Sequence, residues 1–92
     1  MVEAKMASHI AAVVSRFPLR ELEIRWQSAC DPRFDEICRD YLEALMALRR
    51  WEGAGSAGAT EAQDYRRMLK ELAAEILAIL DRPRRRFAAD GG

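Results

Sequence analysis

Residues 60–82, TEAQDYRRMLKELAAEILAILDR, and residues 32–52, PRFDEICRDYLEALMALRRWE, decide the fold. In both stretches the apolar residues recur at alternating spacings of three and four, which is the pattern of one face of an α-helix. The two stripes consist of Phe34, Cys38, Tyr41, Leu45 and Leu48, and of Ala62, Tyr65, Leu69, Leu72, Ile76 and Ile79. A short Gly/Ala/Ser-rich segment, residues 53–59, joins them. We therefore predict an antiparallel, coiled-coil-like helical hairpin.

Capping residues mark where the two hairpin helices begin. Asp31 precedes Pro32, so we expect Asp31 to cap the helix over residues 32–52, with Pro32 in its first turn. Thr60 is followed three residues later by Gln63, which predicts a capping box at the start of the helix over residues 60–82.

Two more helices are predicted before the hairpin, over residues 4–17 and 18–30, with Pro18 at the boundary between them. Leu19, Leu22, Trp26 and Ala29 fall on one side of the helix 18–30. The hairpin stripes are wider than a contact between two helices needs, because they are flanked by Ile37, Leu42, Met46, Trp51, Met68, Leu77 and Leu80. We predict a single all-α domain, residues 1–92: a small helical bundle in which the hairpin is covered by one or two N-terminal helices and completed by dimerisation. Residues 83–92 are expected to form a flexible, Arg-containing tail.

Composition excludes several classes of function. The chain has 92 residues, half of them apolar, and a net charge of zero. It therefore has no overall field that would attract nucleic acid or an acidic membrane. One histidine and two cysteines are too few for a zinc site, and two cysteines do not indicate a disulfide-stapled secreted domain. The apolar patch at residues 10–14 is too short to span a membrane. We expect a cytoplasmic protein with no metal, cofactor or membrane contact.

Isolated reactive residues give no active site. The sequence places no carboxylate or nucleophile beside His9, so we expect a surface or partly packed side chain. Cys38 falls on the apolar stripe and is expected to be buried. Cys30 lies beside the helix start at Asp31, which leaves a redox role open, although no resolving cysteine is evident. We predict a protein that is not an enzyme and has no catalytic residues.

Two kinds of partner contact remain open. Aromatic residues and methionine are enriched at interfaces, so Trp26, Met46, Trp51 and Met68 are candidates for a self-association or partner surface. The simpler interpretation is that these four side chains belong to the core. We predict a helical protein–protein interaction module that self-associates.

The alternative function uses the basic cluster Arg84, Arg85 and Arg86. These side chains would contact nucleic acid or another acidic surface through a salt-dependent interaction without sequence preference. No recognition-helix pattern accompanies the cluster, which disfavours nucleic acid as the partner. The same arginines also suit the end of a helix, where positive charge is favourable.

The order and spacing of the helix-boundary motifs in this chain resemble those of the YdcH-like family of small bacterial proteins. The resemblance spans residues 17–80 and begins with Phe17-Pro18 and Asp31-Pro32-Arg33-Phe34. It continues with the pattern formed by Tyr65, Leu69, Leu72, Glu75, Ile76 and Leu80. The turn of this chain is richer in Gly and Ala than is usual in the family. Membership implies a helical hairpin of unknown function and brings no catalytic residues.

Overall fold

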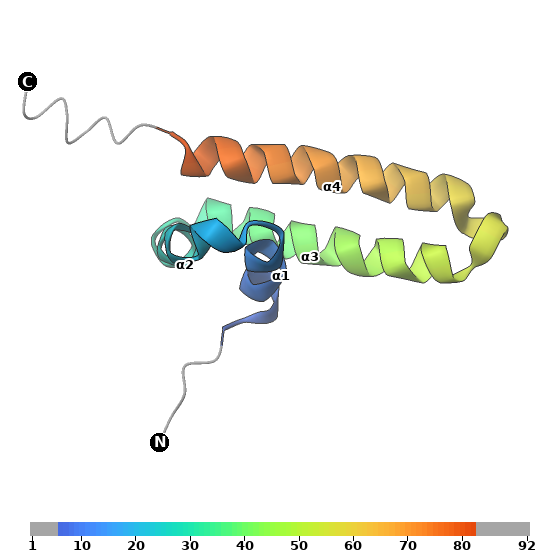
Figure 1. The fold of residues 1–92 in the computed structure, drawn as a ribbon, viewed down its shortest axis with the longest axis horizontal. Coiled ribbons are helices and arrows are strands. Elements are labelled where there is room, and N and C mark those ends of the chain that lie inside the picture. The colour runs from blue at the N-terminus through green and yellow to red at the C-terminus, as the bar shows by residue number, and fades with distance from the viewer. Residues whose placement is uncertain (1–5, 83–92) are drawn as a thin grey trace, which may run out of the picture.

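The computed structural model describes residues 6–82. Its elements in chain order are α1 (Ser8–Arg16), η1 (Pro18–Arg20), α2 (Glu21–Cys30), α3 (Pro32–Gly53), η2 (Gly55–Gly58) and α4 (Ala59–Leu80). The predicted all-α fold is confirmed, and α3 and α4 run antiparallel as a long hairpin (Figure 1). Residues 4–5 of the first predicted helix and the predicted tail over residues 83–92 lie outside the described residues.

The two N-terminal helices cover only one end of the hairpin. Both α1 and α2 lie beside the half of α3 and α4 that is remote from η2, and the other half extends beyond them (Figure 1). We call this second half, residues 44–69, the hairpin arm. The N-terminal helices therefore supply the additional cover that the wide stripes require, but only over half the length of the hairpin.

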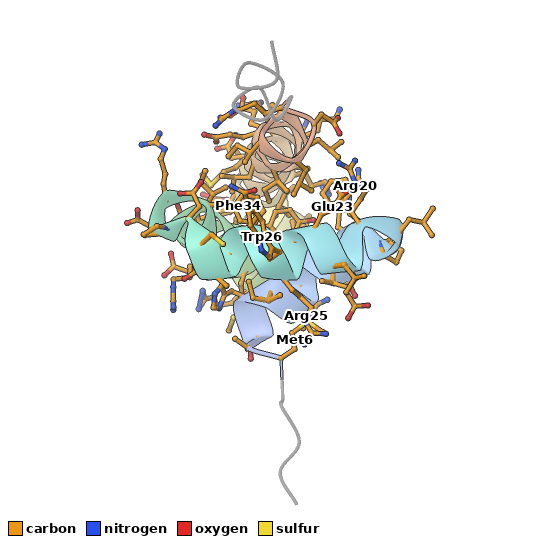
Figure 2. The ribbon with its side chains drawn as sticks, turned by 90° about the vertical axis from the view of Figure 1, so that its left-hand side faces the viewer. Met6, Arg20, Glu23, Arg25, Trp26 and Phe34 are labelled. Carbon is orange, nitrogen blue, oxygen red and sulfur yellow. The ribbon has the colours of Figure 1, made fainter. Side chains whose placement is uncertain are left out.

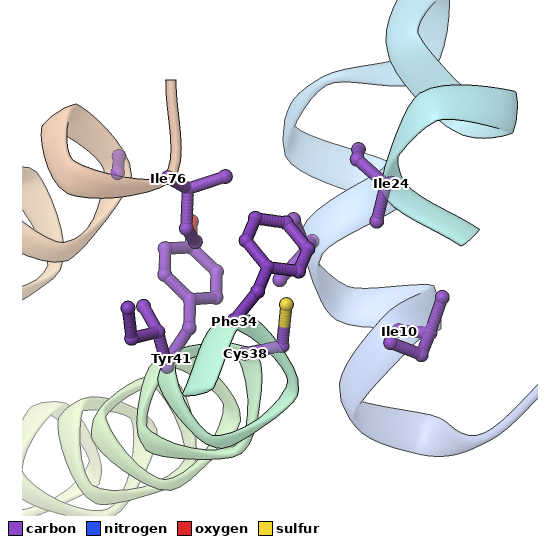
Figure 3. Close-up of a cluster of buried hydrophobic side chains, with 9 residues drawn as sticks. Ile10, Ile24, Phe34, Cys38, Tyr41 and Ile76 are labelled. Carbon is purple, nitrogen blue, oxygen red and sulfur yellow. The ribbon is translucent and has the colours of Figure 1, made fainter. Parts of the chain in front are cut away.

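The main core forms where all four α-helices meet. The fully buried Phe34 of α3 lies between Ile24 of α2 and Ile76 of α4 (Figure 3). Around these side chains the buried cluster comprises Ile10, Val13, Ile37, Cys38, Tyr41 and Ala73. Burying a large apolar side chain contributes about 1.5–3 kcal/mol, so this cluster is the main source of stability in the described chain.

The hairpin arm is held by smaller contacts. Its buried residues are Ala44, Ala47, Leu48, Gly58 and Ala62, and none of them belongs to the main cluster. A Cβ atom at Gly58 would lie 2.5 Å from the Trp51 carbonyl oxygen, so the chain can pass Trp51 at η2 only with glycine. Gly55 has a φ of +67°, a conformation that is strained for other residues. These two glycines allow the tight turn between α3 and α4.

The cap predicted for α3 is confirmed and the one predicted for α4 is wrong. Asp31 Oδ1 accepts hydrogen bonds from the backbone N–H groups of Arg33 and Phe34, at 3.1 and 3.3 Å. In α4 the N-cap position is held by Gly58, which makes no side-chain cap. The packing of Gly58 against Trp51 sets the helix start before Thr60. Thr60 is therefore already within the first turn of α4.

The apolar side predicted for residues 18–30 does not face the core. The helix forms with a 3₁₀ first turn, but Leu19, Leu22 and Trp26 are exposed by 96%, 79% and 55%. The side chain that enters the core is Ile24, which is fully buried. Ile24 is two residues from Leu22, so the two side chains leave the helix on nearly opposite sides. The core has room for one side of α2, and Ile24 occupies it.

Candidate interaction surfaces

The four predicted interface residues are all exposed, but they do not form one surface. Trp26 lies on the outer side of α2 (Figure 2), and Met46, Trp51 and Met68 lie on the hairpin arm. The exposed fractions of Met46, Trp51 and Met68 are 56%, 37% and 44%. The alternative interpretation, that all four belong to the core, is not what the structure shows.

The first candidate surface, which we call the α2 surface, is defined by Leu22 and Trp26 on the outer side of α2 and by Leu19 in the preceding turn η1. Leu22 and Trp26 are four residues apart and lie on the same side of α2, and Leu19 precedes them in the 3₁₀ turn η1. We refer to these three exposed side chains together as the ridge. Charged residues of both signs border it. Arg25 is 3.2 Å from Glu21, and Arg20 forms ion pairs with Glu23 and, at 2.8 Å, with Asp81. An apolar ridge with a charged border is the usual composition of a protein contact site.

The sequence predicted an interface role for Trp26 but not for Leu19 or Leu22. The sequence feature that could have indicated their exposure is Ile24, which lies on the side of the helix opposite Leu22 and Trp26. A helix of this length with apolar residues on opposite sides, attached to a small core, can bury only one of them.

The second candidate surface is a groove of about 580 Å³ between α3 and α4. Its apolar lining is Ala44, Ala47, Tyr65, Met68 and Leu72, and its polar lining is Asp40, Glu43 and Arg50. Met68 is the only one of the four predicted interface residues that lines it. Asp40 and Glu43 are both exposed.

A third feature is a polar cluster centred on the Asp35 carboxylate. Asp35 Oδ1 accepts hydrogen bonds from His9 Nε2 at 2.7 Å and from Ser28 Oγ at 2.5 Å, and Asp35 Oδ2 accepts one from Arg39 Nε at 3.1 Å. The bonds from Ser28 and His9 lower the pKa of Asp35 from 3.8 to about 2. His9 is buried, contrary to the expectation of an isolated histidine, because folding brings Asp35 from another helix against it.

This cluster connects helices and does not have the order of a catalytic relay. In a Ser–His–Asp triad the histidine lies between the carboxylate and the serine. Here His9 and Ser28 donate to the same carboxylate oxygen of Asp35. The hydroxyl proton of Ser28 therefore points at the carboxylate and not at the imidazole of His9. The cluster therefore holds α1, α2 and α3 together.

The two cysteines lie in different environments. Cys38 is fully buried, and burial together with the nearby Asp35 carboxylate raises the pKa of its thiol to about 12. Cys30 is exposed. Within residues 6–82, no group of three or more His, Cys, Asp or Glu side chains is placed to hold a metal ion. Over the same residues, no helix has both the length and the apolar character needed to cross a membrane.

The basic cluster Arg84, Arg85 and Arg86 lies outside the described residues. A comparison of the chain with protein-family models, with curated proteins and with solved structures finds no match.

Proposed function

We propose that this protein is a non-enzymatic helical interaction module that self-associates through the α2 surface. The observation that carries the proposal is the exposure of Leu22 and Trp26 on α2, whose other side is buried through Ile24, together with the exposure of Leu19 in the preceding turn η1. Single exposed apolar residues are ordinary on protein surfaces, but here three large ones are exposed within eight residues of sequence, two of them one helical turn apart on α2. Covering this ridge removes apolar area from water, and that is the main driving force of helix association.

A second copy of the chain is the occupant that we propose for the α2 surface. The net charge of zero means that two copies do not repel each other as a whole. The border of the ridge carries both Arg20 and Arg25 and both Glu21 and Glu23, so it can oppose a copy of itself without a uniform clash of like charges. Dimers most often form through such a self-complementary patch.

The resemblance to the YdcH-like family and the low number of cysteines support placing this module in the bacterial cytoplasm. The alternative role, contact of Arg84, Arg85 and Arg86 with nucleic acid or another acidic surface, rests on the sequence alone. It predicts binding to DNA that weakens steeply with salt and is lost in the triple Arg-to-Ala variant.

Sedimentation equilibrium of three chains tests self-association. The chains are the wild type, Leu19→Gln with Leu22→Gln, and the control Met46→Gln, which changes a similarly exposed apolar residue on the hairpin arm. We expect the wild type and the control to dimerise alike and the double variant to be monomeric at the same concentrations. A wild type that is monomeric throughout the concentration range would contradict self-association. Loss of the dimer in Met46→Gln alone would move the contact from α2 to the arm.

A further inference from the structure

The groove between α3 and α4 lies on an acidic face of the hairpin. Asp40 and Glu43 border the groove itself. Glu36 is one helical turn before Asp40 on α3, and Glu71 and Glu75 follow Met68 by three and seven residues on α4, so all three fall on the same side as the groove. All five carboxylates are exposed. None of them has a cation within ion-pair distance among residues 6–82, although six ion pairs between arginine and a carboxylate form elsewhere in that range.

The two ends of the groove carry charges of opposite sign. Asp40 and Leu72 line the end nearer the C-terminus of α4, and Arg50 and Tyr65 line the end nearer η2. A segment entering from the end of α4 therefore meets carboxylates first, then the apolar side chains of Ala44 and Met68, and finally a guanidinium.

The segment that follows α4 carries the matching order. Residues 84–90 read RRRFAAD: three arginines, then three apolar residues, then Asp90. Basic residues would meet the carboxylates, Phe87 would meet the apolar floor of the groove, and Asp90 would meet Arg50. The order of charges in residues 84–90 is therefore opposite in sign to the order of charges along the groove, for a segment that runs from the end of α4 toward η2.

The length of this segment fits the groove. Leu72 is eight residues before Leu80, the last residue of α4, a distance of about 12 Å along the helix, and Tyr65 is fifteen residues before it, about 23 Å. An extended chain covers about 3.3 Å per residue. If residues 81–83 reverse the direction of the chain, Arg86 would lie about 7 Å and Asp90 about 20 Å back along α4 from the level of Leu80. With the reach of an arginine side chain, both residues arrive at the ends of the groove that carry the opposite charge.

We propose that residues 84–90 of this chain fold back and bind in an extended conformation along the α3–α4 groove of the same molecule. The three arginines pair with the acidic face, Phe87 packs against Met68 and Leu72, and Asp90 pairs with Arg50. This docking is separate from the α2 surface and does not depend on self-association. It gives the arginine cluster a partner within the chain and covers Met68.

Paramagnetic relaxation enhancement in the full chain tests this docking. A nitroxide is attached at Ala89→Cys in a Cys30→Ser background, where Cys38 is buried and does not react. We expect the nitroxide to remove the backbone amide signals of Ala44, Ala47 and Met68 and to leave those of α1 intact. Retention of all groove signals would overturn the proposal. A mixture of isotope-labelled chains without nitroxide and unlabelled chains with it shows whether the contact crosses between molecules, and signal loss in that mixture alone would overturn folding back within one molecule.

Charge reversal then tests the pairing itself. Reversing the groove with Asp40→Arg and Glu43→Arg should restore the lost signals, as should reversing the tail with Arg84→Glu, Arg85→Glu and Arg86→Glu. Combining both reversals should bring the signal loss back. A control with the same change in net charge, Glu52→Arg with Asp64→Arg, alters exposed carboxylates that do not line the groove and should leave the signal loss unchanged. Failure of the combined variant to recover the signal loss, or an equal effect of the control, would overturn the proposed charge pairing.

Discussion

His9 Nε2 lies 2.7 Å from Asp35 Oδ1, so an ion-pair-forming contact joins α1 to α3 across 26 positions of sequence. Ser28 of α2 donates to the same carboxylate oxygen. The side chain of Asp35 is about one-quarter exposed, so water screens its hydrogen bonds in part. This single carboxylate connects both N-terminal helices to the hairpin.

Asp35 predicts a specific pH dependence of stability. Its pKa is about 2 in the folded chain, below the ordinary 3.8, because the hydrogen bonds favour the ionised form. The stabilisation is complete above about pH 5, falls as the pH passes the ordinary value of 3.8, and is lost as the pH falls through the folded value near 2. After allowance for solvent screening we expect about 1–2 kcal/mol at neutral pH.

Urea unfolding of the wild type and Asp35→Asn between pH 7 and pH 3 measures this contribution. The gap in unfolding free energy should be constant from pH 7 to about pH 5 and should narrow toward pH 3. Asp64→Asn is the control, because it removes a carboxylate that is 59% exposed, does not line the groove, and pairs only at 3.6 Å with Arg67 of the same helix among residues 6–82. An equal effect of both substitutions at every pH would contradict a special role for Asp35.

The orientation of α2 is tested by two substitutions on that one helix. Ile24→Ala removes a fully buried side chain and should lower the unfolding free energy by about 2–5 kcal/mol. Leu22→Ala removes an exposed side chain, and its effect should stay within about 0.5 kcal/mol. Both are measured by chemical unfolding at a concentration low enough to keep the chain monomeric. A larger loss for Leu22→Ala would mean that α2 packs with its other side inward.

The turn between α3 and α4 requires glycine at position 58 but not at position 53, the last residue of α3. Gly58→Ala would place a Cβ atom 2.5 Å from the Trp51 carbonyl oxygen, and we expect it to cost about 1–3 kcal/mol through backbone shifts. Gly53 has nothing within 4 Å of the corresponding position. Gly53→Ala should therefore be neutral or stabilising by up to about 1 kcal/mol. Thermal unfolding of the two variants separates these outcomes, and similar melting temperatures would contradict the close contact at Trp51.

The thiol of Cys30 should react faster than that of Cys38, because Cys30 is exposed to the reagent and Cys38 is buried with a raised pKa. A maleimide needs the thiolate, and the pKa of Cys38 is raised to about 12 by burial. Under native conditions at neutral pH we expect one label per chain, at Cys30, with Cys38 reacting only in denaturant. Mass spectrometry of digested, labelled protein locates the site. Rapid native labelling of Cys38 would show that the core around Phe34 opens on the timescale of the reaction.

Periodic and capping signals in the sequence determined the local elements. The uninterrupted stripes over residues 32–52 and 60–82 predicted the hairpin, because a helix with one apolar face must bury it against another. Asp31 and Pro32 predicted the start of α3, because their effect on a helix end is local. Cys38 was predicted to be buried from its place on the stripe. These features depend on residues within a few turns of one another.

Tertiary structure alone decided which side of each element is used. The α2 helix has apolar residues on two sides, and the space left between α1, α3 and α4 accepts Ile24, so Leu19 and Leu22 remain outside. The capping box at Thr60 gave way to the close passage of Gly58 past Trp51. The pairing of His9 with Asp35, and the placing of Asp40 and Glu43 beside Met68, require helices distant in sequence to meet. The spacing of residues along the chain shows which side chains lie on the same side of a helix. The neighbour that each side contacts is decided only when the whole chain packs.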